Sequence, residues 1–77
     1  AEIVEPVRIE AGVRVKGGRI GPNVTLESGS VVENATLEDT LVGADTHLSG
    51  VTLAHSLIGD RAQVRNVHGT VNLASDR

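Results

Sequence analysis

The aliphatic residues of this chain recur at intervals of five or six positions, which is neither a helical period nor that of an ordinary strand. A helix would place apolar residues three and four positions apart, and a sheet buried on one face would show alternation over longer runs. Short flat strands separated by corners fit the interval, with one aliphatic anchor in each strand. The anchors are Ile3, Ile9, Val15, Ile20, Leu26, Val32, Leu37, Val42, Leu48, Leu53, Ile58 and Val64.

Every third anchor belongs to one column, and members of a column lie 16 or 17 residues apart. If three steps make one turn of a three-sided coil, each anchor stacks on its counterpart in the next coil at roughly 4.8 Å. We therefore predict an all-β fold, a parallel β-helix of about four three-sided coils with 16–17 residues each. The alternative, a small β-sandwich, would not keep three columns in register over repeated cycles.

The corners support this register independently. Two residues after each third-column anchor stand the residue types that most readily adopt a left-handed backbone: Gly17, Asn34, Gly50 and Asn66. Three residues after each second-column anchor stand Gly12, Gly29, Asp45 and Arg61, of which only Arg61 departs from the pattern. The residues that follow them have a size suited to the interior: Val13, Ser30, Thr46 and Ala62. The expected first-column corner residues are Pro6, Asn23, Thr40 and Ser56.

Composition narrows the class of protein. The 77 residues include no Phe, Tyr, Trp or Met, so Val, Ile, Leu and Ala must build the interior, which suits stacked flat layers. Ten acidic and seven basic residues give a net charge of −3, and without aromatic rings we discount nucleic acid as a partner. No run is apolar enough to predict a membrane span. The absence of Cys favours the cytosol, and we expect a cytoplasmic protein.

Several steps resemble the hexapeptide repeat, in which an aliphatic residue is followed by Gly or a polar residue and, four places on, by a small one. They are IGPNVT (20–25), LESGSV (26–31), VGADTH (42–47) and IGDRAQ (58–63). Proteins with this repeat form left-handed parallel β-helices, so the resemblance implies the left hand. Spacing alone does not, because parallel crossovers are otherwise right-handed almost without exception.

A closer resemblance is to the C-terminal domain of sugar-phosphate nucleotidyltransferases, in particular long-form glucose-1-phosphate thymidylyltransferases. It is carried by EPVRIEAGVRVKGGRIGPNVTL (5–26), VVENATLEDTLVG (31–43), HSLIGDRAQV (55–64) and VNLASDR (71–77). Those enzymes bind nucleoside triphosphate, sugar phosphate and Mg²⁺ in an N-terminal α/β domain with a Gly-rich loop that carries Arg. This chain has no such loop, so no catalytic, cofactor-binding or metal-binding residue carries over. For this chain the resemblance implies an assembly role.

We expect coils over residues 1–67 and a C-terminal cap or tail over 68–77, where Val71 and Leu73 would plug the core. The catalytic domain would be absent from the chain, which begins at Ala1 without Met and has the character of a piece of a longer protein. In the resembling family that domain covers the N-terminal end of the β-helix. Whether this segment is itself an enzyme stays open.

Three histidines, His47, His55 and His68, raise the alternative of a hexapeptide-repeat acyltransferase or a zinc enzyme. The register assigns them to different corners and sides, so one chain would not gather them, although zinc shared between chains stays open. An acyltransferase would also show a long loop near its reactive histidine, whereas every coil here has 16 or 17 residues. We interpret the acidic residues as outward charges at turns rather than a proton-transfer pair: Glu33, Glu38, Asp39, Asp45 and Asp60.

Leu41 and Leu57 are the candidate interface residues. Each directly precedes a second-column anchor, so both are expected to face outward and to stack into an apolar stripe of the kind that marks association. The alternative is a local register shift that buries both. Val51 and Val67 form a similar pair, for which we expect burial.

The sequence therefore predicts the oligomerisation and scaffold domain of a nucleotidyltransferase, associating as a homo-oligomer, with a trimer favoured. The parent enzyme would transfer a nucleotidyl group to a sugar 1-phosphate. An acyltransferase fragment, which would bind coenzyme A, and a free-standing structural β-helix are the alternatives.

Overall fold

A computed structural model describes residues 2–69 and the backbone of residues 72–73. Within these residues the chain forms short parallel strands and no helix, wound into about four turns. The strands are β1 (Glu2–Ile3), β2 (Val7–Ile9), β3 (Arg14–Ile20), β4 (Val24–Leu26), β5 (Val31–Glu38), β6 (Leu41–Val42), β7 (His47–Ser49), β8 (Thr52–Ala54), β9 (Leu57–Ile58), β10 (Gln63–Arg65), β11 (His68–Gly69) and β12 (Asn72–Leu73).

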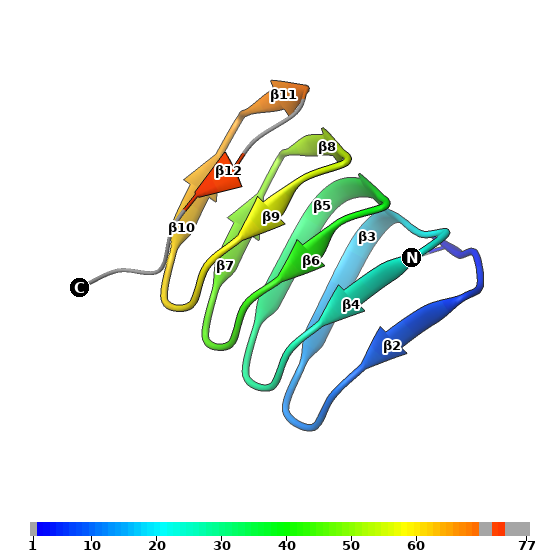
Figure 1. Ribbon diagram of the computed structural model, residues 1–77, viewed down its shortest axis with the longest axis horizontal. Coiled ribbons are helices and arrows are strands. Elements are labelled where there is room, and N and C mark those ends of the chain that lie inside the picture. The colour runs from blue at the N-terminus through cyan, green and yellow to red at the C-terminus, as the bar shows by residue number, and fades with distance from the viewer. Residues whose placement is uncertain (1, 70–71, 74–77) are drawn as a thin grey trace.

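The strands form the three flat sides of a prism (Figure 1). Side 1 carries the first column, on β1, β8, β11 and the C-terminal parts of β3 and β5. Side 2 is a separate five-stranded sheet of β2, β4, β6, β9 and β12. Side 3 carries the third column, on β7, β10 and the N-terminal parts of β3 and β5. Corner 1 joins sides 1 and 2, corner 2 joins sides 2 and 3, and corner 3 joins sides 3 and 1.

The coils wind in the left-handed sense. In Figure 1 the near strands β4 and β6 run toward the lower left, and the chain returns behind them along β3 and β5. The stack meanwhile advances toward the upper left, from blue to red. This combination describes a left-handed parallel β-helix, as the repeat resemblance implied.

All three predicted columns are confirmed by the strand register. In the first column Ile20 pairs with Ile3 and with Leu37, and Leu37 pairs with Leu53. The second and third columns continue in the same way through every coil. Together with neighbouring small residues they fill a core of Ile20, Val24, Leu26, Val32, Ala35, Leu37, Val42, Leu48, Val51, Leu53, Ile58 and Val64. Burial of these aliphatic side chains is the main stabilising contribution, at about 25 cal/mol per Å².

Positive backbone angles mark corner 3, as its residue types predicted. Gly17, Asn34, Gly50 and Asn66 have φ of 70°, 51°, 63° and 53°. The two glycines are also needed for space, because the Asn34 side chain lies over Gly17 and that of Asn66 lies over Gly50. Asn supplies the left-handed conformation and the glycine of the preceding coil leaves room for its side chain, so the two types alternate.

Corner 2 adopts the same conformation in every coil. Gly12, Gly29, Asp45 and Arg61 have φ of 76°, 77°, 55° and 57°. Arg61, the residue type that did not fit the predicted column, is therefore held left-handed by its position in the coil. The next residue points inward, and both Ser30 and Thr46 are buried.

The described C-terminal residues continue the helix. Gly69 of β11 pairs with Leu53, and Leu73 of β12 pairs with Ile58, so both strands extend the ladders of sides 1 and 2. The cap or tail predicted over residues 68–77 stays a prediction. Val71 and residues 74–77 lie outside the described residues, and the proposed division after residue 67 stays a prediction.

Candidate assembly surface

The outer face of side 2 exposes two large aliphatic side chains. Leu41 and Leu57 pair in register on β6 and β9, and they are 37% and 51% exposed. The residues that follow them, Val42 and Ile58, are fully buried, because successive side chains of a strand point to opposite faces. The predicted outward orientation is confirmed, and the alternative register shift that would bury both leucines is wrong.

These leucines belong to a row that runs along side 2. Over the first four strands of that side, the leucine row holds the residues that precede the second-column anchors: Arg8, Thr25, Leu41 and Leu57. The glutamate row holds the residues that follow the anchors: Glu10, Glu27, Gly43 and Gly59. Side 2 is therefore polar and charged over the first two coils, whereas over the third and fourth coils it exposes Leu41 and Leu57, each followed two positions later by a glycine.

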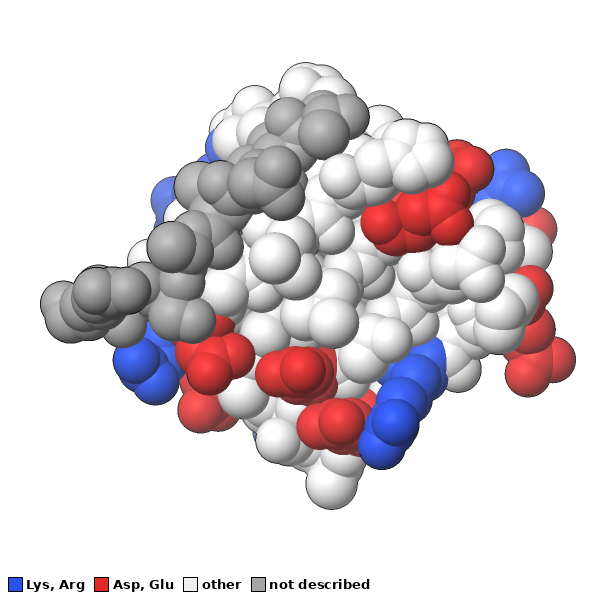
Figure 2. Space-filling model, in the orientation of Figure 1, with Lys and Arg blue, Asp and Glu red and all other residues white. Residues whose placement is uncertain are grey.

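Figure 2 shows side 2 facing the viewer, with uncharged surface over its centre and acidic side chains gathered along corner 2. Arg8 and Glu10 mark the charged part of the face, with Arg8 Nε 3.8 Å from Glu10 Oε2. The Arg8 side chain is 77% exposed, so this pair within one chain contributes little to stability. Glu10 is held in place because Oε1 accepts a hydrogen bond from the Ser28 amide at 3.1 Å.

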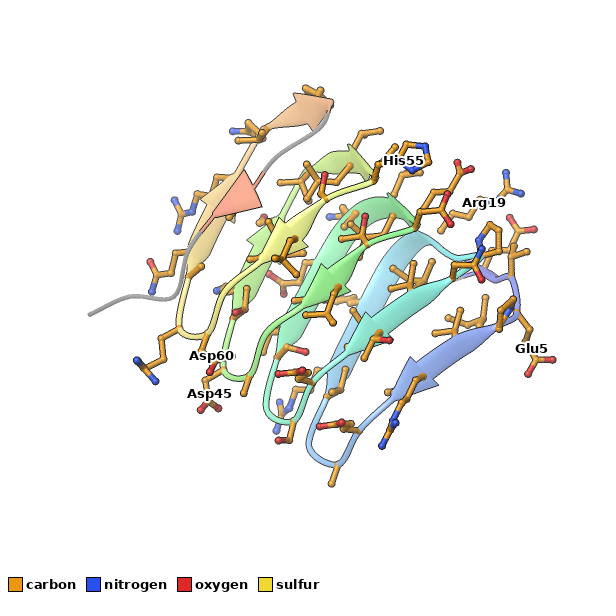
Figure 3. All side chains as sticks on the ribbon, in the orientation of Figure 1. Glu5, Arg19, Asp45, His55 and Asp60 are labelled. Carbon is orange, nitrogen blue, oxygen red and sulfur yellow. The ribbon has the colours of Figure 1, made fainter. Side chains whose placement is uncertain are left out.

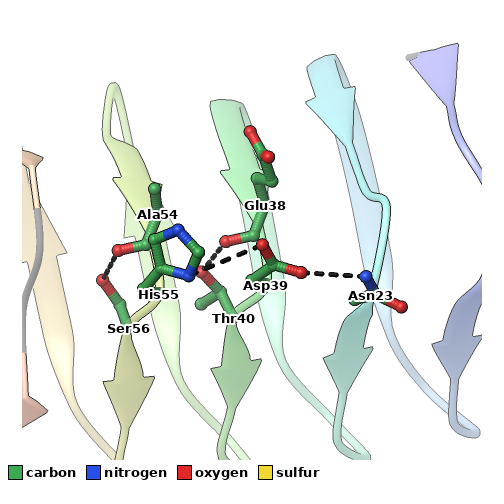
Figure 4. A network of polar contacts seen from close by, with 7 residues as sticks. All are labelled: Asn23, Glu38, Asp39, Thr40, Ala54, His55 and Ser56. Carbon is green, nitrogen blue, oxygen red and sulfur yellow. Dashed lines mark hydrogen bonds and ion pairs between the residues drawn. The ribbon is translucent and has the colours of Figure 1, made fainter.

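Corner 1 carries a ladder of polar side chains (Figure 4). Asn23 Nδ2 donates to Asp39 Oδ1 at 2.9 Å, and Asp39 Oδ2 lies 3.5 Å from His55 Nδ1. The three residues have φ of 60°, 49° and 51°, so each occupies the left-handed position of its coil. The ladder connects three successive coils on the outside of the prism.

This ladder corrects the predicted alignment of corner 1. Thr40 and Ser56 do not stand beside Asn23 but one place later, beside Val24, where they are buried. Their hydroxyl groups donate to the carbonyl oxygens two residues earlier, of Glu38 at 2.8 Å and of Ala54 at 2.9 Å. A buried hydroxyl bonded to its own turn costs little, and both residues therefore serve packing.

The three histidines lie on three different parts of the prism, as the register predicted. His47 begins β7 on side 3, with Nε2 3.1 Å from Glu33 Oε1, and His68 begins β11 on side 1. His55 belongs to the corner 1 ladder. Within residues 2–69, no three His, Asp or Glu side chains are placed to hold a metal ion. A zinc site shared between chains stays a prediction.

Asp45 and Asp60, the acidic residues weighed for proton transfer, lie at corner 2 (Figure 3). The Asp45 carboxylate lies over Gly29. Asp60 Oδ1 accepts the Ala44 amide hydrogen at 2.9 Å, which anchors the fourth coil on the third. Asp39 and Glu33 are engaged with the histidines named above, and Glu38 follows the first-column anchor Leu37. These contacts give the acids structural roles at turns and on sides.

Two of the hollows in the described surface lie away from Leu41 and Leu57. One, of about 380 Å³, is lined by residues of the first two coils near corner 1, including Pro6, Arg8 and Asn23. The other, of about 550 Å³, lies on side 3 beside Arg14, Lys16 and Glu33.

Val51 and Val67 lie at corner 3. Val51 is buried, and Val67 is half-buried against the core, so the expected burial of this pair is confirmed. At the first coil, by contrast, the core is open. Ile3 and Ile9 are 44% and 46% exposed although they belong to the same columns as fully buried residues.

No helix within the described residues is long and apolar enough to cross a bilayer. No family model, curated protein or solved structure matches the chain.

Proposed function

We propose that this chain is an assembly module, a rigid β-helix that joins copies of itself through side 2. The observation that carries the proposal is the exposure of Leu41 and Leu57 side by side on strands whose inward residues, Val42 and Ile58, are fully buried. Covering such a stripe stabilises the complex by about 25 cal/mol per Å² of apolar surface removed from water. Pairing of β6 with β4 and β9 holds the backbone of the leucines in a fixed geometry, so little backbone entropy is lost on association.

We further propose that the module is the C-terminal domain of a sugar-phosphate nucleotidyltransferase, cytoplasmic, whose catalytic domain provides the Mg²⁺-dependent chemistry. The sequence resemblance supports this finer proposal. The open first coil supports it too, because Ile3 and Ile9 offer an apolar surface suited to a preceding domain. Sequencing the gene upstream of this segment tests it. A Gly-rich nucleotide-binding domain is expected there, and any other neighbour contradicts this proposal without touching the assembly role.

Sedimentation equilibrium of the 77-residue chain, from about 10 μM to 1 mM, tests the assembly role. We expect the average mass to rise above that of one chain, and L57R to abolish the rise, because it places a charge in the apolar stripe. The matched control is T52R, which adds the same charge at an exposed position of side 1 in the same coil. A chain that stays monomeric throughout, or equal loss in L57R and T52R, contradicts the proposal. The number of copies, predicted as three, is read from the same data.

A further inference from the structure

We infer that side 2 is built to face side 2 of a second copy, with the two prisms side by side and parallel. This inference rests on the proposed assembly role and specifies its partner and symmetry. A two-fold axis parallel to the helix axis keeps equal coils at equal height and reverses the strand direction. The leucine row of one copy then faces the glutamate row of the other at every coil.

The third and fourth coils match in shape under this symmetry. Leu41 of one copy lies opposite Gly43 of the other, and Leu57 lies opposite Gly59. Each leucine thus meets a position without a side chain, and the arrangement is repeated on the other half of the interface by the two-fold axis. Gly43 is buried, and a Cβ there would meet the Asp60 carboxylate and the Gly59–Asp60 backbone of the next coil, so this position presents backbone rather than a side chain of its own to Leu41.

The first and second coils match in charge and hydrogen bonding. Arg8 of one copy lies opposite Glu10 of the other, and Thr25 lies opposite Glu27. Glu10 is already oriented by the Ser28 amide, while the Arg8 side chain is 77% exposed and able to reach across. A cation and a hydroxyl donor in one row therefore face two carboxylates in the other, which favours this register over shifted ones.

The antiparallel pairing of the same two faces lacks these matches. Over the first four strands of side 2 it would place the first coil against the fourth, with Arg8 opposite Leu57 and Glu10 opposite Gly59. Thr25 would lie opposite Leu41. Charged groups would lose water without gaining a partner, at a cost that a small interface cannot offset.

The other two sides of the prism also receive the leucines poorly. At the height of the third and fourth coils, side 1 presents Thr36 and Thr52 outward. Side 3 presents His47 and Gln63 at the same height. Within the described residues, the third and fourth coils carry large outward aliphatic side chains on side 2 alone. In a three-fold trimer, the side that carries the leucines would face a different surface of the next copy. Because sides 1 and 3 present polar residues at that height, we expect a two-fold dimer rather than the trimer predicted in the sequence analysis.

The face is small, since the five strands of side 2 at about 4.8 Å spacing span only roughly 20 Å. Stable complexes commonly bury about 800 Å² on each partner, so we expect weak association, with Kd of roughly 10 μM to 1 mM. If other parts of a longer protein also held the two copies together, the local concentration of side 2 would be high. The weak interface would then form even at low protein concentration.

Exchange of the charges between two chains tests the pairing. R8E and E10K each place like charges opposite one another in a homodimer, so each alone should associate at least about tenfold more weakly than the unaltered chain. In a mixture, each acidic position of the R8E chain faces a basic position of the E10K chain. Mixed dimers should therefore form. Sedimentation equilibrium at low salt measures this, because the Debye length of about 30 Å at 0.01 M leaves the charges unscreened.

The matched control is R14E, which reverses a charge on side 3 in the same coil and should associate like the unaltered chain. Thermal unfolding by circular dichroism confirms that each variant is folded. A mixture that gains dimer over both separate variants supports the pairing. Trimers, or variants that associate normally and gain nothing on mixing, overturn it but leave the assembly role standing. A monomer in the unaltered chain at 1 mM overturns both.

Discussion

The first coil and the second coil contain residues of the same columns but bury them differently. Ile3 and Ile9 are 44% and 46% exposed, whereas Ile20 and Leu26, the next members of their columns, are fully buried. The residue types are equivalent, so the difference arises from position alone. A coil in a β-helix is sealed only when a neighbour lies on each side of it, and the stability of the stack therefore depends on contacts between neighbours.

The largest effect expected from this difference is at Leu26. L26A removes a fully buried side chain between two coils, and we expect a loss of about 2–5 kcal/mol in the free energy of unfolding. I9A is the matched variant in the same column and should cost about 1 kcal/mol or less, because Ile9 is already half in water. Urea unfolding followed by circular dichroism measures both. Equal losses would mean that the first coil is covered in solution.

A second substitution tests how tightly the first coil packs against the second coil. G18A should cost more than about 2 kcal/mol, because a Cβ at Gly18 would collide with the Ala35 carbonyl group and φ there is 83°. The control, G12A, has a similar φ of 76° but its Cβ would lie 3.5 Å from the nearest atom, so about 1 kcal/mol is expected. The urea concentrations at the unfolding midpoints of both variants measure the two losses in stability. A mild effect of G18A would contradict tight stacking of the first coil on the second.

The smallest expected effect concerns hydroxyl groups inside the sealed coils. Within the described side chains, Ser30 Oγ is buried without a hydrogen-bond partner, so S30A should be neutral or stabilise by about 1 kcal/mol. Thr46, next in the same row, donates to the Gly59 carbonyl at 2.8 Å, and T46V should cost about 0.5–1.5 kcal/mol. Differential scanning calorimetry resolves the opposite signs. Destabilisation by S30A would show that its hydroxyl is satisfied in solution.

Much of this architecture was predictable because each strand holds one aliphatic anchor and the corners repeat their residue types. The columns and corner 3 follow directly from that regularity. Corner 1 was misaligned because the first- and second-column anchors are six residues apart in the first two coils and five apart in the next two. The residue types alone do not show at which position the shorter coils lack a residue. The ladder of Asn23, Asp39 and His55 resolves this, since backbone conformation rather than residue type defines it.

The candidate surface was predicted only in part. Leu41 and Leu57 were identifiable because each precedes an anchor, and the strand alternation made them face outward. The same reasoning applied one residue after each anchor would have found Glu10, Glu27 and Gly43, but charged and glycine residues are common on surfaces and gave no signal alone. Their meaning depends on lying opposite the leucine row of another copy, which is a property of two chains rather than one.

The central claim is that copies meet over the leucines of side 2, and methyl NMR of the leucine-labelled chain tests it directly. As concentration rises from about 10 μM to 1 mM, the Leu41 and Leu57 methyl signals should shift, while those of the interior Leu37, Leu48 and Leu53 stay in place. Concentration-independent spectra, or shifts confined to other residues, would contradict the account.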